Sequence, residues 1–255
     1  MADKNILGPA GRLHVDDGGD GDPPVFFVHA FAGSASQWRD QLAHVRRSHR
    51  AVAVDLRGHG LSEARFDADL AIDALADDIA AAADECHLDR FVLVGHSVGG
   101  AAAISYADAH PDRVLGLVLV SAPGRVPHDH ARQILGALER DFEHTYDGYW
   151  SRLLIGSGIE VEVRVRADAA HVSRGTAMRM LREVLAYDPV PALRRFHGPA
   201  TAITTPLSDA PYELHNLIPG LMHFVMPGTS HWAFMDKPAE FNRLLDDIVN
   251  VSASP

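Results

Sequence analysis

Short runs of apolar, mostly β-branched residues recur along the chain, separated by longer stretches whose apolar positions follow helical spacing. The runs have the length of buried strands, and the stretches between them are typical of helices. The sequence thus predicts strands in the segments 25–28, 51–55, 91–94, 114–120, 200–205 and 222–226. Strands that alternate with helices at this spacing indicate an α/β fold, with a mostly parallel sheet and helices on both faces.

Residues 123–187 interrupt this alternation. Pro123 and Pro127 open the segment, and Asp188–Pro189 closes it. Between these ends the apolar positions follow helical spacing and predict no clear strand. Even the stretch 161–166, in which apolar and charged residues alternate, is expected to be helical or irregular. The segment is therefore predicted to be a mainly helical stretch within the α/β pattern.

The strand expected at 91–94 runs directly into Gly95-His96-Ser97-Val98-Gly99 and then into an alanine-rich helix. This strand–turn–helix context makes the Gly-x-Ser-x-Gly pattern a nucleophile elbow, in which the serine occupies a strained turn. A Cβ at Gly95 or Gly99 would crowd the turn or hold the helix away from the strand. We therefore expect the Oγ of Ser97 to be exposed at the carboxyl edge of the sheet, near the unpaired N–H groups of a helix N-terminus.

With this motif and this order of elements, the chain resembles the α/β-hydrolase fold superfamily, and within it the small serine esterases that carry a cap. The resemblance extends over nearly the whole chain. It implies that residues 1–122 and 188–255 form the hydrolase core and that residues 123–187 form a helical cap inserted into it. It also implies a catalytic triad in the chain order serine, acid, histidine.

The resemblance implies Ser97 as the nucleophile, His231 as the base and Asp209 as the acid. His231 follows the last expected strand and precedes Lys237-Pro238-Ala239-Glu240-Phe241, a run similar to the one after the family's catalytic histidine. Asp209 is the one acid in the loop after the next-to-last expected strand, although that loop lacks the glycine of the family's common Gly-x-x-Asp pattern. Glu213, at the start of the next helix, is the alternative acid.

The resemblance further implies an oxyanion hole made of two backbone N–H groups, those of Phe31 and Val98. Phe31 lies in the loop after the strand at 25–28, where Ala30 stands in place of a glycine that is usual in the family. The side chains expected to line the substrate pocket are aromatic; they are Phe142, Tyr146, Trp150 and Trp232.

A site of this kind cleaves esters in two steps. His231 takes the proton of Ser97, whose Oγ attacks the carbonyl, and water then releases the acyl-enzyme. We therefore expect a serine hydrolase for carboxylic esters of small to medium size, with no metal and no organic cofactor. The same site can serve a lactonase, a perhydrolase or a C–C bond hydrolase. A slow-turnover small-molecule receptor of the same fold is the alternative outside the enzymes.

Composition narrows the set of partners. The 255 residues carry 23 basic and 34 acidic side chains, a net charge of −11, with no prominent cluster of Lys or Arg. Nucleic acids and anionic membranes are therefore not expected as partners. The N-terminal residues lack the apolar run of a signal peptide, no stretch is apolar enough to span a membrane, and the single Cys86 can form no intrachain disulfide. The expected location is the cytoplasm, and nothing in the sequence sets the oligomeric state.

Overall fold

The computed structural model describes residues 2–252, so residues 1 and 253–255 of the expected core lie outside the described part. Within it, eight strands form one sheet in the order β1-β2-β4-β3-β5-β6-β7-β8. The strands are β1 (Ala2–Gly8), β2 (Gly11–Gly18), β3 (Val25–Val28), β4 (Ala51–Val54), β5 (Phe91–His96), β6 (Val114–Val120), β7 (Ala200–Thr204) and β8 (Met222–Val225). β2 pairs antiparallel with β1 and β4, and all the other pairs are parallel. The expected α/β fold with a mostly parallel sheet is confirmed.

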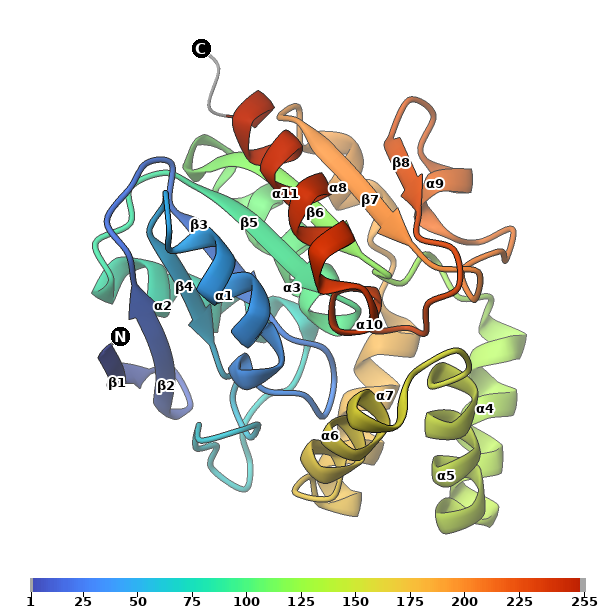
Figure 1. Cartoon of the computed structure of the whole chain (residues 1–255). Helices are drawn as coiled ribbons and strands as arrows, with labels where there is room; N and C mark the ends of the chain where they lie inside the picture. The colour runs from blue at the N-terminus through green and yellow to red at the C-terminus, as the bar shows by residue number, and fades with distance from the viewer. Residues whose placement is uncertain (1, 253–255) are drawn as a thin grey trace.

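Helices cover both faces of the sheet (Figure 1). α1 (Arg39–Val45) and α11 (Pro238–Ser252) contact each other on one face, and the other face carries α2 (Ile72–Glu85), α3 (Val98–Ala109) and α8 (Val190–Arg195). Short helical turns complete the core; they are η1 (Ala35–Trp38), η2 (Pro111–Arg113), α9 (Leu214–Leu217) and α10 (Ala233–Asp236). Among residues 2–252, no helix combines the length and the apolar character that are needed to cross a bilayer.

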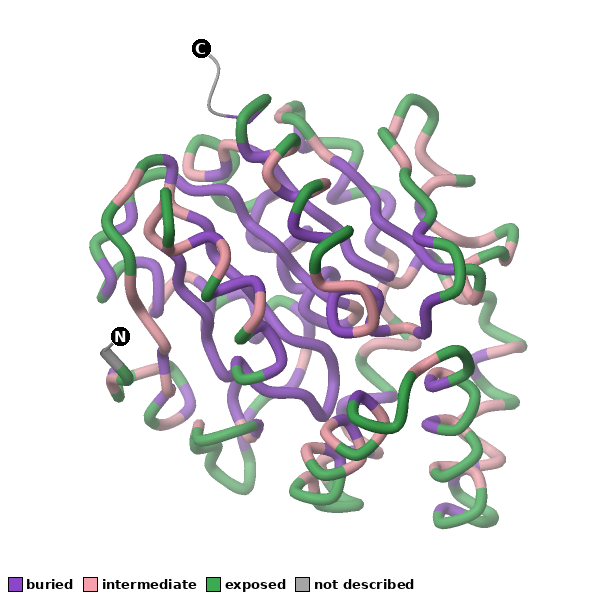
Figure 2. The backbone as a smooth tube through the Cα atoms, in the orientation of Figure 1, coloured by how far each residue is buried: buried purple, intermediate pink, exposed green. Residues whose placement is uncertain are grey.

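The buried core lies between the sheet and its covering helices, and buried backbone follows the central strands (Figure 2). Every residue of β3, β4 and β5 is buried, as expected for parallel strands that are covered on both faces. Small residues let α3 approach the sheet closely, since a Cβ built on Gly100 would lie 2.6 Å from the Cβ of Ala122. This close approach fixes the start of α3, and with it the residue that joins β5 to α3.

Four further helices come between β6 and α8. They are α4 (His128–Arg140), α5 (Phe142–Leu153), α6 (Ile159–Ala169) and α7 (Arg174–Ala186). We call residues 128–186 the four-helix segment; it lies beyond the carboxyl ends of the parallel strands (Figure 1). The stretch 161–166 belongs to α6 and is helical despite its alternating pattern, because Val161 and Val165, one helical turn apart, are buried on one face.

Candidate active site

Ser97 occupies the sharp turn between β5 and α3. Its backbone has φ 51° and ψ −116°, a conformation that L-residues rarely adopt outside strained functional turns. The turn has no room for side chains at the flanking glycines. A Cβ on Gly95 would lie 2.4 Å from the carbonyl oxygen of Gly99, and a Cβ on Gly99 would lie 2.4 Å from that of His29. The structure therefore contains the strand, strained serine and helix that the sequence predicts.

Two backbone N–H groups near this turn are free to bind a ligand. Val98 is the first residue of α3, so its N–H has no acceptor within the helix. The N–H of Phe31 likewise donates to no backbone or side-chain acceptor among the described residues. Phe31 follows β3, which pairs with β5 in parallel with Val28 opposite Gly95, so both N–H groups lie at the same edge of the sheet. Their placement suits the binding of a developing negative charge beside Ser97.

His29 shapes the loop that carries Phe31. Its ring contacts the carbonyl oxygen of Ala30 through Nδ1 at 2.7 Å, and the backbone N–H of Leu56 donates to Nε2 at 2.9 Å. The two partners are consistent with a neutral ring protonated at Nδ1, and burial lowers the pKa of His29. Both ring nitrogens of His29 thus have a partner, and they hold the loop in which Ala30 stands in place of the usual glycine.

His231 lies beside the elbow. Nε2 of His96, the residue before Ser97, donates to the carbonyl oxygen of His231 at 3.0 Å, and the centroids of the two imidazole rings are 4.7 Å apart. The backbone N–H of His231 donates to the carbonyl oxygen of Leu153, at the end of α5, at 3.0 Å. Burial lowers the pKa of His231 to about 4, so the ring is neutral and able to accept a proton at neutral pH.

A second set of contacts fixes the loop that carries His231. The backbone N–H and the hydroxyl of Ser230 both donate to one carboxylate oxygen of Asp236 at 2.7 Å. The backbone N–H of Trp232 donates to the Ser230 hydroxyl at 3.2 Å. Asp236 therefore orders this loop through Ser230.

The predicted acid does not meet the predicted base in this structure. Asp209 is exposed in the loop after β7, and within residues 2–252 no carboxylate forms a hydrogen bond or ion pair with the His231 ring. Asp209 lies near Glu213 instead. Burial and the neighbouring charge of Asp209 raise the pKa of Glu213 to about 7. The structure therefore brings His231 to the Ser97 elbow and leaves both candidate acids apart from His231.

The four predicted pocket residues form one aromatic cluster around Phe31. Phe31 stacks on Trp150 with centroids 6.0 Å apart, and Trp150 in turn lies 5.9 Å from Trp232. Tyr146 meets Phe31 edge-on at 6.3 Å and stacks on Phe142 at 4.9 Å. α5 thus places three aromatic side chains between the loop that carries Phe31 and the loop that carries His231, which we call the histidine loop. We call these five residues the aromatic cluster.

Gln37, in η1, links α6 to the histidine loop and is not indicated by any sequence motif. Its side-chain amide donates from Nε2 to the carboxylate of Asp168 in α6 at 2.7 Å, and its Oε1 accepts from Nε1 of Trp232 at 3.3 Å. The hydroxyl of Ser34 also donates to Asp168, at 3.2 Å. A buried amide between two loops and an inserted helix has no local sequence signature, so only the three-dimensional arrangement reveals it.

No group of three or more His, Cys, Asp or Glu side chains that could hold a metal ion occurs among residues 2–252.

Comparison with known proteins extends the likeness beyond this site. The family model described as "alpha/beta hydrolase fold" matches residues 23–155. A Variovorax paradoxus protein named for carbamate hydrolysis is 37% identical over 127 residues, which are 49% of this chain and 47% of that protein. The match thus spans about half the length of that relative. Epoxide hydrolase 3 of Xenopus tropicalis is 27% identical over an aligned length of 277 residues, gaps included. The alignment covers 93% of this chain and 74% of that protein.

Among solved structures, a thermophilic esterase from Thermogutta terrifontis has the same fold. It superposes with a TM-score of 0.83 over 100% of both chains, at 21% sequence identity. The match of the family's sequence model to more than half of the residues, together with this architecture, leads to one conclusion. The chain belongs to the α/β-hydrolase fold family.

Proposed function

We propose that the chain is a serine hydrolase that cleaves carboxylic esters of small to medium size through an acyl-enzyme on Ser97. The observation that carries the proposal is the strained Ser97 turn, together with the free N–H groups of Phe31 and Val98 at the same sheet edge and the neutral His231 in contact with His96. This is the combination that nucleophilic acyl transfer needs.

In the proposed mechanism His231 takes the proton of the Ser97 hydroxyl as Oγ attacks the ester carbonyl. The N–H groups of Phe31 and Val98 donate to the oxyanion of the tetrahedral intermediate. His231 then protonates the leaving alcohol, and the acyl group remains on Oγ. Water, deprotonated by His231, releases the acid and restores Ser97. Each oxyanion donor supplies about 3 kcal/mol of stabilisation in enzymes of this kind.

Residues 123–187 act as the cap in this proposal. The four-helix segment covers the carboxyl ends of the strands, and its aromatic side chains contact both Phe31 and Trp232. A small ester is therefore held between Phe142, Tyr146 and Trp150 on the cap side and Ser97 and Trp232 on the core side.

Asp209 is proposed as the acid that orients His231, with Glu213 as the alternative. Because Asp209 is exposed, its loop has to shift toward His231 for the carboxylate to bind the imidazole. Asp209→Asn and Glu213→Gln separate the two assignments: the variant of the true acid loses most of kcat, and the other retains it.

Steady-state hydrolysis of p-nitrophenyl esters from acetate to decanoate tests the proposal. We expect fast multiple turnover, and we expect Ser97→Ala to lower kcat/KM by about a thousandfold or more. Ser105→Ala is the matched control, since Ser105 lies in the same α3 and its hydroxyl donates to Asp73 away from the site. Activity that survives in Ser97→Ala would refute the acyl-enzyme. A single burst without further turnover would favour the slow-turnover receptor.

A further inference from the structure

Two buried hydrogen-bond donors in α5 have no acceptor. The hydroxyl of Tyr146 and Nε1 of Trp150 are both inaccessible to solvent, and neither makes a hydrogen bond of ordinary geometry among the described residues. The two groups are polar neighbours, since burial raises the pKa of the Tyr146 hydroxyl and the Trp150 side chain, close to its oxygen, offsets part of that rise. Trp150 is only 4% exposed. Buried donors without partners are rare because they give up their bonds to water and gain nothing in return. These two lie on the same helix next to the proposed active site, so they are available to an acceptor on a bound ligand.

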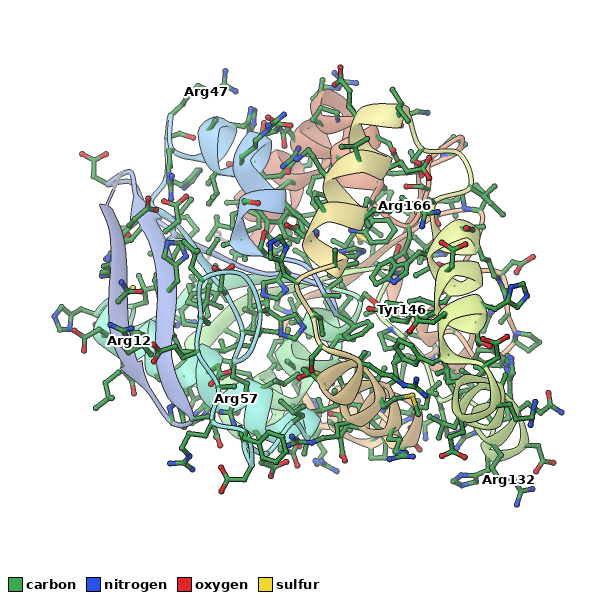
Figure 3. All side chains as sticks on the ribbon, turned by 90° about the horizontal axis from the view of Figure 1, so that it is seen from below. Arg12, Arg47, Arg57, Arg132, Tyr146 and Arg166 are labelled. Carbon is green, nitrogen blue, oxygen red and sulfur yellow. The ribbon has the colours of Figure 1, made fainter. Side chains whose placement is uncertain are left out.

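The two donors face the proposed active site. Tyr146 and Trp150 are four residues apart in α5, so they lie on one side of the helix. Both rings contact the ring of Phe31, and Trp150 also contacts Trp232, next to His231. The side chain of Tyr146 lies on the side of α5 that faces the body of the molecule (Figure 3). A ligand bonded to these donors would therefore lie against the loop that carries Phe31 and the histidine loop.

The surroundings of the donors define the chemistry of such a ligand. The aromatic cluster provides flat ring faces, which favour a flat ring as the partner. The donors are neutral, and the cation at the cluster, Arg174, is an exposed side chain 4.8 Å from the ring centroid of Phe142. A buried anion would need a closer positive charge, whereas a neutral oxygen or ring nitrogen needs only the two donors.

We propose that Tyr146 and Trp150 form a hydrogen-bonding subsite for a neutral acceptor on an aromatic ring, so that the preferred substrates are esters carrying a heteroaromatic or acceptor-substituted ring. This inference rests on the proposed ester hydrolysis for its reaction, and on the two unpartnered donors for its specificity. Tyr146 and Trp150 are specificity-determining residues in this proposal, and the reaction itself stays with Ser97 and His231.

Methyl benzoate and the three methyl pyridinecarboxylates test the subsite, because they differ only in the replacement of one ring CH by an acceptor nitrogen. We expect the wild type to prefer at least one pyridine ester in kcat/KM. Tyr146→Phe and Trp150→Phe should each reduce that preference by about two- to tenfold, the range for one hydrogen bond. Methyl benzoate is the internal reference in each variant, so the weaker ring packing that follows removal of the indole cancels from the ratio.

Tyr149→Phe is the matched control, since it removes a hydroxyl from the same helix next to Trp150, at 5.3 Å between ring centroids. It should leave the preference unchanged. A Tyr146→Phe variant should also keep or raise the wild-type melting temperature, because the hydroxyl that it removes is unpaired in the free protein. Equal rates for benzoate and all three pyridine esters in the wild type would overturn the subsite. An unchanged preference in the Tyr146→Phe, Trp150→Phe double variant would also overturn it.

Calorimetry on Ser97→Ala keeps this test separate from the test of the proposed function. We expect a methyl pyridinecarboxylate to bind this protein more tightly than methyl benzoate, and Tyr146→Phe to remove the difference. If wild-type protein hydrolyses no ester while this binding preference holds, the proposed reaction fails and the subsite stands. If esters are hydrolysed and no binding preference exists, the subsite fails and the reaction stands.

Discussion

His231, the proposed base, has a ring with a low pKa and no carboxylate partner among the described residues. The pKa of about 4 places its protonation far below neutral pH. With no carboxylate on the imidazole, kcat/KM for a p-nitrophenyl ester is expected to stay flat from about pH 8 down to about pH 5, because the base remains neutral over this range. The proposed shift of Asp209 toward His231 predicts instead an acid limb at about pH 6.5, because the carboxylate raises the pKa of the imidazole. A pH profile of kcat/KM measures this directly.

A profile that stays flat down to about pH 5 would contradict the shift of Asp209. An acid limb at about pH 6.5 or above would mean that a carboxylate reaches the imidazole in the working enzyme and raises its pKa. The profiles of Asp209→Asn and Glu213→Gln would then identify the carboxylate, because removing it should move the limb to lower pH.

At the residue scale, the sequence predicts features that depend on the backbone geometry of single residues. It does not predict contacts between side chains that lie far apart in the chain. Gly95 and Gly99 predict the strained Ser97 turn. A Cβ at either position would collide with the backbone of α3 or of His29, so only glycine fits there. The acid has no such signal. The loop with Asp209 lacks a diagnostic glycine, and its position relative to His231 depends on how the loop folds over the sheet edge. Asp209 as the acid stays a prediction.

At the scale of elements, Gln37 joins the four-helix segment to the histidine loop. The residue is 2% exposed, and its amide serves Asp168 at one end and Trp232 at the other. We predict that Gln37→Leu lowers the free energy of unfolding by about 2 kcal/mol, because one hydrogen bond to a charged group is lost and two polar groups lose a partner. Urea unfolding measures the loss. We also expect kcat/KM to fall, since Trp232 adjoins His231.

Asp168→Asn provides the matched comparison for Gln37→Leu. Asparagine keeps a carbonyl oxygen at the same place, so the bond from Gln37 survives in neutral form and the loss should be under about 1 kcal/mol. Equal effects of the two substitutions would show that charge, rather than the bridge through Gln37, holds the elements together.

Most elements follow from hydrophobic pattern because each buries one continuous surface. Every strand from β3 to β8 appears within two residues of its expected segment. β1 does not, since it is polar and lies at the edge of the sheet with β2 as its one neighbour, so its apolar pattern is weak. The stretch 161–166 shows the opposite case: alternation suggests a strand, and burial of Val161 with Val165 selects a helix. Whether such a segment becomes a strand or a helix depends on the elements that it pairs with or packs against. These elements lie far away in the chain.

At the scale of the whole molecule, within residues 2–252, His29, His59 and His96 are buried and His231 is partly buried, and all four rings are in the neutral form. Burial lowers the pKa of His29, His59, His96 and His231, to about 4 for His59 and His231. In the unfolded chain these rings bind protons near pH 6.5. Stability is therefore fully present above that pH and is lost as pH falls toward the folded pKa, by up to about 1.4 kcal/mol per pH unit for each ring.

We predict a steep fall in the free energy of unfolding between about pH 6.5 and about pH 4.5, measurable by urea unfolding across that range. His14 and Glu213 work in the other direction. The hydrogen bond to Asp55 raises the pKa of His14, and burial with the neighbouring charge of Asp209 raises the pKa of Glu213 to about 7, so both groups favour the folded state at lower pH and offset part of the fall. As a check on the cause, His59→Asn should give a shallower slope. A stability that stays constant down to about pH 5 would refute the prediction.

The four-helix segment also has a consequence for the order in which the chain folds. β6 and β7 are neighbours in the sheet, with Leu117 opposite Ala200, although the whole segment lies between them in the chain. Closing so long a loop costs more entropy than pairing β3 with β4. Helices form from local contacts, so their early formation would shorten the loop. The pairing of β6 with β7 is therefore expected to come late in folding. The four-helix segment would then already be formed before the last part of the sheet is in place.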